Sequence, residues 1–173
     1  DTSGSVTSIS STTTLPLLVD VRGVADPVVI AVQPTFTTTE AAVDGGGRQI
    51  ALAGVITSVT PLDSDGSEAV NLVVTGVPAG FSVQGLAFLG GVGIGRIWSG
   101  TPSQLAASSL VVRDANYSGT VTFNIRAVST ENDGNSLSGS DIPVSIAVSP
   151  SPEALLPTQT SALEDTLTPL NLA

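Results

Sequence analysis

The stretch Thr120–Val128, which reads TVTFNIRAV, decides the fold class of this chain. Apolar and polar residues alternate along it, which is the pattern of a β-strand with one face on a core and the other facing water. The apolar face would carry Val121, Phe123, Ile125 and Ala127. The polar face would carry Thr122, Asn124 and Arg126. We therefore predict a half-buried strand here.

The same alternation extends to Val144, Ile146 and Val148 near the end of the chain. Further strands are predicted over Gln49–Thr57, Ala69–Thr75, Phe81–Gln84, Gly95–Ser99 and Leu110–Arg113. Seven to eight short strands separated by turn residues indicate an all-β protein with two packed sheets. One helical turn is expected at Thr101–Gln104, where a capping threonine, a proline and a glutamine have the spacing of a capping box.

Composition agrees with this fold and narrows the function. Hydrophobic residues make up 41% of the 173 residues but aromatic residues only 3%, so the core must consist mainly of Val, Leu, Ile and Ala. Fifteen acidic residues against five arginines and no lysine give a net charge of −10, which repels nucleic acid and anionic lipid. We therefore expect no nucleic-acid partner. We also expect no membrane insertion, because no apolar run reaches the length of a membrane span.

The chain contains neither cysteine nor histidine. Thiol nucleophiles, disulfides, imidazole bases and the usual zinc and haem ligands are therefore excluded. An extracellular domain without disulfides needs a large core or another stabilising element, such as a bound metal ion.

Internal repetition predicts the domain organisation. Leu15–Val21 resembles Ile142–Val148, and the segment around Glu40 resembles the one around Glu164, so the offset is close to 125 residues in each case (142 − 15 = 127; 164 − 40 = 124). A period of that length fits a row of independent domains. We predict that residues 1–25 are the C-terminal tail of one repeat, 26–149 a complete β-sandwich repeat, and 150–173 the start of a third.

The clearest chemical signal is the acidic loop Asp63-Ser64-Asp65-Gly66-Ser67-Glu68. Its three carboxylates can turn toward one hard cation, and Ca²⁺ prefers six to eight oxygen ligands in a flexible arrangement. A solvated acidic turn is the alternative interpretation. The loop is not an EF-hand, because the twelfth position counted from Asp63 is Val74 rather than Glu.

Two further carboxylates, Asp26 and Glu40, are expected to converge on this loop at one end of the sandwich. Like charges placed so closely would repel one another unless a cation lay between them. Asp133, in contrast, lies in a sequence typical of a turn. Tyr117 is predicted to support the corner before a late strand.

The order of these elements resembles a known family. Gly23-Val24-Ala25-Asp26-Pro27, then Glu40, the acidic loop 63–68 and Val77-Pro78-Ala79-Gly80 are similar to the Ig-like or cadherin-like tandem repeats of giant type I-secreted bacterial adhesins of the RTX type. The resemblance implies a Greek-key Ig-like sandwich that binds Ca²⁺ through Asp26, Glu40, Asp63, Asp65 and Glu68 at the junctions between repeats. Where the family often has Glu-Asp-Thr, this chain has Glu40-Ala41-Ala42, so one ligand is lost or replaced, for instance by Asp44. Asp133, Glu164 and Asp165 stay open as further ligands.

Three functions follow as hypotheses. The first is a structural extender of an extracellular adhesin on the bacterial cell surface, stiffened by Ca²⁺ and projecting a distal ligand-binding region, with neighbouring repeats as its partners. The second is a module that binds sugar or peptide, for which Trp98 and Tyr117 are the candidate aromatic residues, although both are expected to support the core instead. The third, an enzyme, is disfavoured because the carboxylates share one tight turn rather than flanking a cleft. We also consider end-to-end pairing of segments 1–25 and 150–173 as complementary edges.

Overall fold

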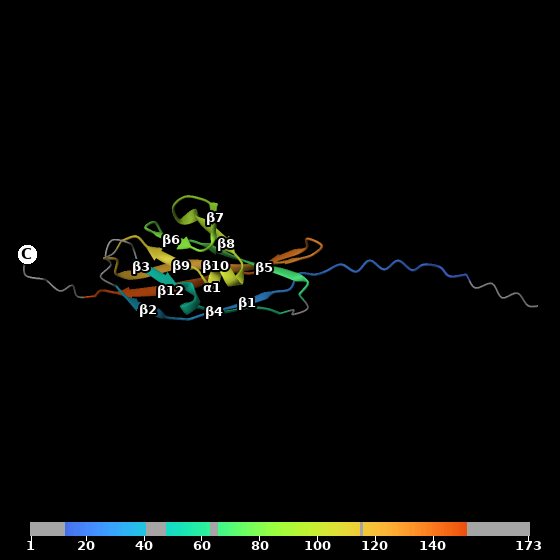
Figure 1. The fold of residues 1–173 in the computed structure, drawn as a ribbon, viewed down its shortest axis with the longest axis horizontal. Helices are drawn as coiled ribbons and strands as arrows, with labels where there is room; N and C mark the ends of the chain where they lie inside the picture. Colours follow the sequence, from blue (N-terminus) through green and yellow to red (C-terminus); the bar gives the residue numbers. More distant parts are fainter. Residues whose placement is uncertain (1–12, 41–47, 63–65, 115, 152–173) are drawn as a thin grey trace, which may run out of the picture.

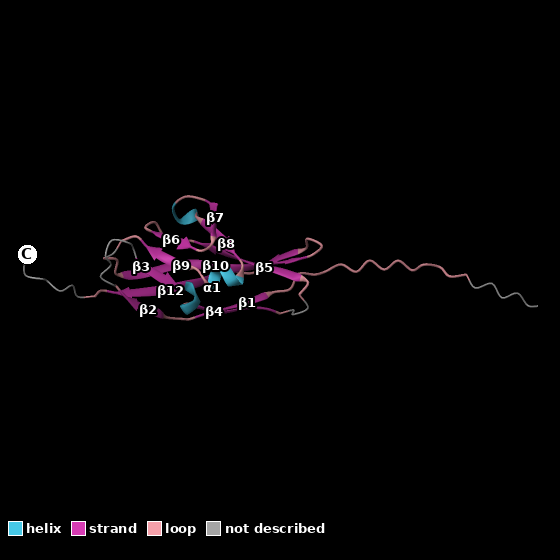
Figure 2. Cartoon of the chain, in the orientation of Figure 1, coloured by secondary structure: helices cyan, strands magenta, loops and turns pink. Residues whose placement is uncertain are grey.

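A computed structural model describes residues 13–40, 48–62, 66–114 and 116–151. Its elements are β1 (Val28–Val32), β2 (Phe36–Thr39), β3 (Arg48–Ala51), η1 (Leu52–Gly54), β4 (Ile56–Pro61), β5 (Glu68–Thr75), β6 (Phe81–Gln84), β7 (Ala87–Gly90), η2 (Gly93–Gly95), β8 (Ile97–Gly100), α1 (Pro102–Ala106), β9 (Ser109–Val112), β10 (Gly119–Glu131), β11 (Ser136–Ser138) and β12 (Ile142–Ser149). The described part of the chain is therefore nearly all β-structure, with one five-residue α-helix and two short 3₁₀ turns (Figure 2).

The strands form three hydrogen-bonded sheets. The largest has the order β2-β12-β10-β5-β8-β7, with β11 added to β10 as a hairpin. A second sheet has the order β3-β9-β6, and β1 pairs with β4 in a third. All pairs are antiparallel except β2 and β12, which run parallel. β1 thus pairs with β4 and the following strand, β2, pairs with β12, so this part of the chain links the two-stranded sheet to the large one (Figure 1).

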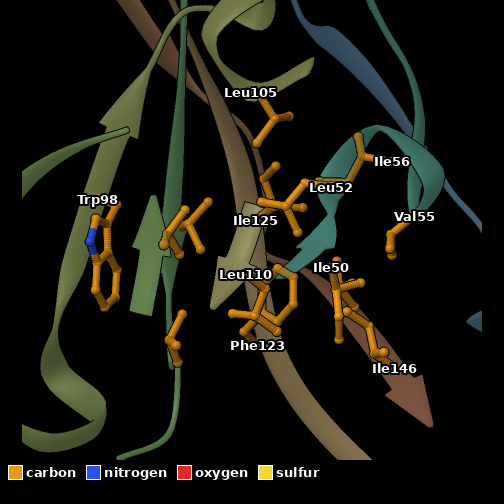
Figure 3. Close-up of a cluster of buried hydrophobic side chains, with 14 of the residues drawn as sticks. Ile50, Leu52, Val55, Ile56, Trp98, Leu105, Leu110, Phe123, Ile125 and Ile146 are labelled. Atoms are coloured by element: carbon orange, nitrogen blue, oxygen red, sulfur yellow. The ribbon is translucent and has the colours of Figure 1, made fainter. Parts of the chain in front are cut away.

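One apolar core lies between these sheets. On β10, Val121, Phe123, Ile125 and Ala127 are all buried, and Ile146 of the neighbouring β12 is fully buried with them. From the opposite sheet Ile50 and Leu110 pack against this face (Figure 3). Aliphatic side chains dominate the cluster, with Trp98 and the phenylalanines Phe81 and Phe123 as its buried aromatic residues. The predicted all-β, Ig-like sandwich fold is confirmed.

Several local predictions are also confirmed. The alternation along Thr120–Val128 lies on β10 with its apolar face inward, as predicted. The capping box at the start of α1 is complete, because Thr101 accepts from the Gln104 amide and the Gln104 side chain accepts from the Thr101 amide. The predicted strand Gln49–Thr57 is interrupted by η1 and forms the two strands β3 and β4. Because of this break, and because β1, β2, β7 and β11 lie outside the predicted strand segments, the described residues contain more strands than the seven to eight expected.

The direction of the strands defines two ends of the sandwich. At one end Glu68 of β5 pairs with Glu131 of β10, and at the other Gly119 of β10 pairs with Val148 of β12. We call these the N-terminal pole and the C-terminal pole, because residues 13–25 lead into the first and β12 ends at the second (Figure 1). The 13 residues of β10 that separate the poles span about 40 Å. Whether segments 1–25 and 150–173 belong to neighbouring repeats stays a prediction.

Candidate functional site

The linker that precedes β1 is fastened to the N-terminal pole by its backbone. The amide of Asp26 donates a short hydrogen bond to Glu68 Oε1. The amide of Ala25 donates to Asn135 Oδ1 at 3.4 Å, and the Ala25 side chain is buried. At Gly23 the backbone lies so close to the carboxyl group of Glu131 that an added Cβ would stand 2.8 Å from its Cδ. Glu68, Glu131 and Asn135 therefore fix the approach of the chain to the sandwich.

Two glutamates lie opposite each other at this pole. Glu68 and Glu131 are opposite each other in the antiparallel pair β5–β10, so their side chains leave the same face of the sheet. Like charges in that position destabilise a sheet. Glu68 Oε2 is buried and has no hydrogen-bond partner among the described residues. A buried, unbonded carboxylate oxygen is costly unless a cation neutralises it.

An open hollow of about 440 Å³ lies between the linker and the pole. The linker side is formed by Val21, Arg22, Gly23, Val24 and Asp26. The domain side is formed by Ser67, Glu131, Asn132 and Asp133. Arg22 is the basic residue in this lining, and its guanidinium pairs with Asp20 at 3.3 Å, where both side chains are largely exposed. The lining of the hollow therefore contains more carboxylate groups than cationic groups.

The donor set of this pole fits calcium in its chemistry. Carboxylate oxygens of Asp26, Glu68 and Glu131, together with backbone carbonyls of the linker, are the hard ligands that Ca²⁺ prefers. Within the described residues, however, no three acidic side chains are close enough to hold a metal ion by themselves. Asp63 and Asp65 lie outside the described residues, and the Leu62 amide, just before them in the sequence, bonds Pro27 O at 3.2 Å. A complete shell would need them.

Glu40 is not at this pole, and its predicted convergence with Asp26 is wrong. β2 continues in the direction of β1 and runs parallel to β12, so it ends where β12 ends. The Glu40 amide donates to Ser149 O at 2.7 Å, and Glu40 Oε2 accepts from the Ser151 amide at 3.4 Å. The structure therefore brings together Asp26 and Glu68 and places Glu40 at the C-terminal pole. Asp44, Glu164 and Asp165 lie outside the described residues.

The remaining candidate residues have structural contacts. Asp133 Oδ1 accepts from the Asn135 amide at 2.9 Å, which confirms the predicted turn. Tyr117 packs edge-on against Phe81 with ring centroids 4.9 Å apart, in keeping with a supporting role. The Trp98 side chain is 4% exposed, so the expectation that it belongs to the core is confirmed.

Sequence reasoning missed Glu131 and Asn135 as residues of this site. Glu131 meets Glu68 only because β5 and β10 pair, and the two residues are 63 positions apart (131 − 68 = 63). The sequence signal that was present is the run Glu131-Asn132-Asp133-Gly134-Asn135, which marks a hairpin turn. Together with the strand order, this turn would have predicted that Glu131 and Asp133 lie near the acidic loop 63–68.

Comparisons with known proteins leave the family open. No protein-family model matches this chain, and no curated protein matches it. Among solved structures, a cohesin module from a family 33 glycoside hydrolase of Clostridium perfringens is similar with a TM-score of 0.38 and 10% identity. That likeness covers 75% of this chain and 100% of the module, and it is too low to support a functional argument. In the described part of the chain no helix has the length and apolar character needed to cross a membrane.

Proposed function

We propose that this chain is a structural extender repeat of an extracellular adhesin on the bacterial surface, in which Ca²⁺ at the N-terminal pole stiffens the linker to the preceding repeat. The repeat projects a distal ligand-binding region and performs no catalysis. Its partners are neighbouring repeats of the same polypeptide. The RTX-type assignment belongs to this proposal and comes from the sequence resemblance described above.

The observation that carries the proposal is the contact of the linker with an unneutralised carboxylate. Glu68 holds the Asp26 amide with one oxygen and buries the other without a partner among the described residues. Glu131, directly across the sheet, adds a second negative charge and touches the linker at Gly23. A cation bound here would neutralise both carboxylates and bridge the linker to the domain. The junction would then be rigid in calcium and looser without it.

The calcium ligands would be Asp26 and Glu68 together with Asp63 and Asp65 of the acidic loop. We add Glu131 to this proposed set because it lies opposite Glu68 in the β5–β10 pair. Glu40 would belong to a junction at the C-terminal pole, where it accepts a hydrogen bond from the Ser151 amide. Bound Ca²⁺ would supply positive charge and coordination, and it would strengthen the contacts that the linker already makes with the domain.

The test is a calcium titration by calorimetry, combined with thermal unfolding of the whole chain in calcium and in chelator. At free calcium about a hundredfold above the dissociation constant, binding to the folded state adds about 2.7 kcal/mol, or a rise in Tm of about 5–10 °C. Glu68→Gln is the decisive variant, because the amide keeps an acceptor for the Asp26 amide but removes the charge. We expect the calcium-dependent rise to disappear in this variant.

Asp141→Asn is the matched control. Asp141 is a carboxylate with an ion-pair partner, Arg126, at 3.1 Å, and it lies away from the hollow. The control should keep the calcium response of the parent chain. Equal unfolding temperatures in calcium and chelator for the parent chain would overturn the proposal.

The alternative function, a module for sugar or peptide binding, gains no support at its candidate residues. Sugar sites stack rings on exposed aromatic faces, whereas Trp98 is buried and Tyr117 packs on Phe81. A glycan array with specific binding that survives removal of calcium would favour this alternative over the extender function.

A further inference from the structure

We propose that the free edge of β7 and the turn that follows it form a docking surface for a second copy of this chain. This inference concerns a different face from the calcium pole and does not depend on calcium binding. The surface, called the β7 edge below, consists of Phe88, Leu89, Val92 and Ile94.

The β7 edge exposes more apolar surface than its neighbours on the sandwich. Phe88 is 55%, Leu89 64%, Val92 88% and Ile94 74% exposed, and all four lie within seven consecutive residues (88–94). Isolated apolar residues are common on protein surfaces, but several exposed apolar residues close together in the chain are typical of an interaction site. The described residues place no strand on the outer side of β7, so its backbone amides and carbonyls on that side stay available for pairing.

The edge strand is short and its pairing with β8 is irregular between Phe88 and Gly90, but it lacks two other features that normally prevent such pairing, charged side chains and proline. Proteins protect edge strands with charged side chains, prolines or covering loops. Residues 85–95 contain no charged residue and no proline. The opposite edge strand of the same sheet, β2, carries three threonines after Phe36 and is polar by comparison.

The turn after β7 is held in place by contacts within the chain. The Gly95 amide bonds Val92 O at 3.0 Å, and the Arg96 guanidinium bonds Gly93 O at 3.0 Å and Pro78 O. Arg96 also lies over the buried Trp98 ring, 5.1 Å from its centroid. Phe88 packs on the same ring with centroids 5.4 Å apart. An apolar surface fixed in this way loses little conformational freedom on binding.

Charge indicates that the occupant is a second copy. The chain carries a net charge of −10, so two copies repel each other when acidic faces approach within the Debye length of about 8 Å. Residues 69–113 contain no aspartate or glutamate, and β7 lies in the middle of this acid-free region. β7 therefore lies in a stretch of the chain that adds no negative charge where two copies would meet. A twofold axis would set β7 antiparallel to its counterpart and join the two large sheets edge to edge.

One such contact is small and would be weak. Four residues of β7 and one turn are fewer than a standard interface supplies. In a row of repeats, as in the proposed function, the same contact would occur many times between two chains lying side by side. The overall affinity between the two chains would then be much higher than that of one contact. The inference thus adds lateral association between copies to the extender function.

The test is sedimentation equilibrium of the whole chain in chelator, over a wide range of protein concentration and at two salt concentrations. We expect a reversible monomer–dimer equilibrium that tightens as salt screens the repulsion between acidic copies. Leu89→Lys should weaken the dimer by about tenfold or more. Leu62→Lys is the matched control, because Leu62 has the same exposed fraction of 64% but lies at the N-terminal pole, and it should leave the dimer unchanged.

Two outcomes would overturn this inference. One is a monomer at the highest concentration and salt. The other is a dimer that resists Leu89→Lys but dissociates when Leu17 and Val19 are both changed to Asp, which would assign pairing to the exposed N-terminal segment instead. Because the measurement is made without calcium, a failure here leaves the calcium proposal untouched, and the reverse is also true.

Discussion

The two poles of this sandwich use glutamate in different ways. At the N-terminal pole Glu68 faces Glu131 across the sheet and buries an oxygen that has no partner in the described residues. At the C-terminal pole Glu40 accepts from the Ser151 amide, and its own amide continues the pairing of β2 with β12. The first arrangement costs stability and, under the proposed function, a bound cation would offset that cost, whereas the second is satisfied by the backbone. Under the proposed function, the positions of the carboxylates, rather than their number, therefore identify the pole that is expected to respond to calcium.

The largest expected effect concerns a substitution in the core, which serves as a reference for substitutions at the two poles. Leu110 is fully buried between the sheets, in a cluster of apolar side chains. Leu110→Ala should lower the free energy of unfolding by about 2–5 kcal/mol through lost burial and a residual cavity. The loss should be equal in calcium and in chelator, as measured by urea denaturation. A loss that changes with calcium would mean that ion binding is coupled to the whole core and not confined to one pole.

An intermediate effect should distinguish Glu131 from an ordinary surface acid. In chelator, Glu131→Gln removes a like charge opposite Glu68 and should stabilise the fold by about 0.2–1 kcal/mol. In calcium, the same variant should lose part of the ion-dependent stabilisation, because one ligand charge is gone. The sign of the change therefore reverses between the two conditions. A shift of the same sign in both, in paired denaturation curves, would remove Glu131 from the site.

These contrasts also show what could be predicted from the sequence and why. The alternation on Thr120–Val128 and the capping box at Thr101 are local signals, since each is complete within a few residues, and both appear in the structure as predicted. The acidic loop was recognised for the same reason. β7 was missed because its apolar residues face outward and glycines follow them, so it lacks the alternation of a half-buried strand.

Relations between distant strands could not be predicted in the same way. The pairing of Glu68 with Glu131 depends on the register of β5 against β10, which no local pattern encodes. The prediction for Glu40 was wrong because the residue pattern of a strand does not reveal its direction in the sandwich. Two acids at either end of a pair of consecutive strands lie close together only when a turn reverses the chain between the strands. Here β1 and β2 run in the same direction, and the acids end about 40 Å apart.

The smallest expected effect is the most direct test of the difference between the poles. The bond from the Ser151 amide to Glu40 Oε2 is long, at 3.4 Å, so it contributes little even though the acceptor is charged. Glu40→Gln should cost about 0.5 kcal/mol or less, by the same amount in calcium and in chelator. If Glu40→Gln abolished the calcium response of the isolated chain while Glu68→Gln preserved it, the ion would bind at the C-terminal pole. The buried oxygen of Glu68 would then need another explanation.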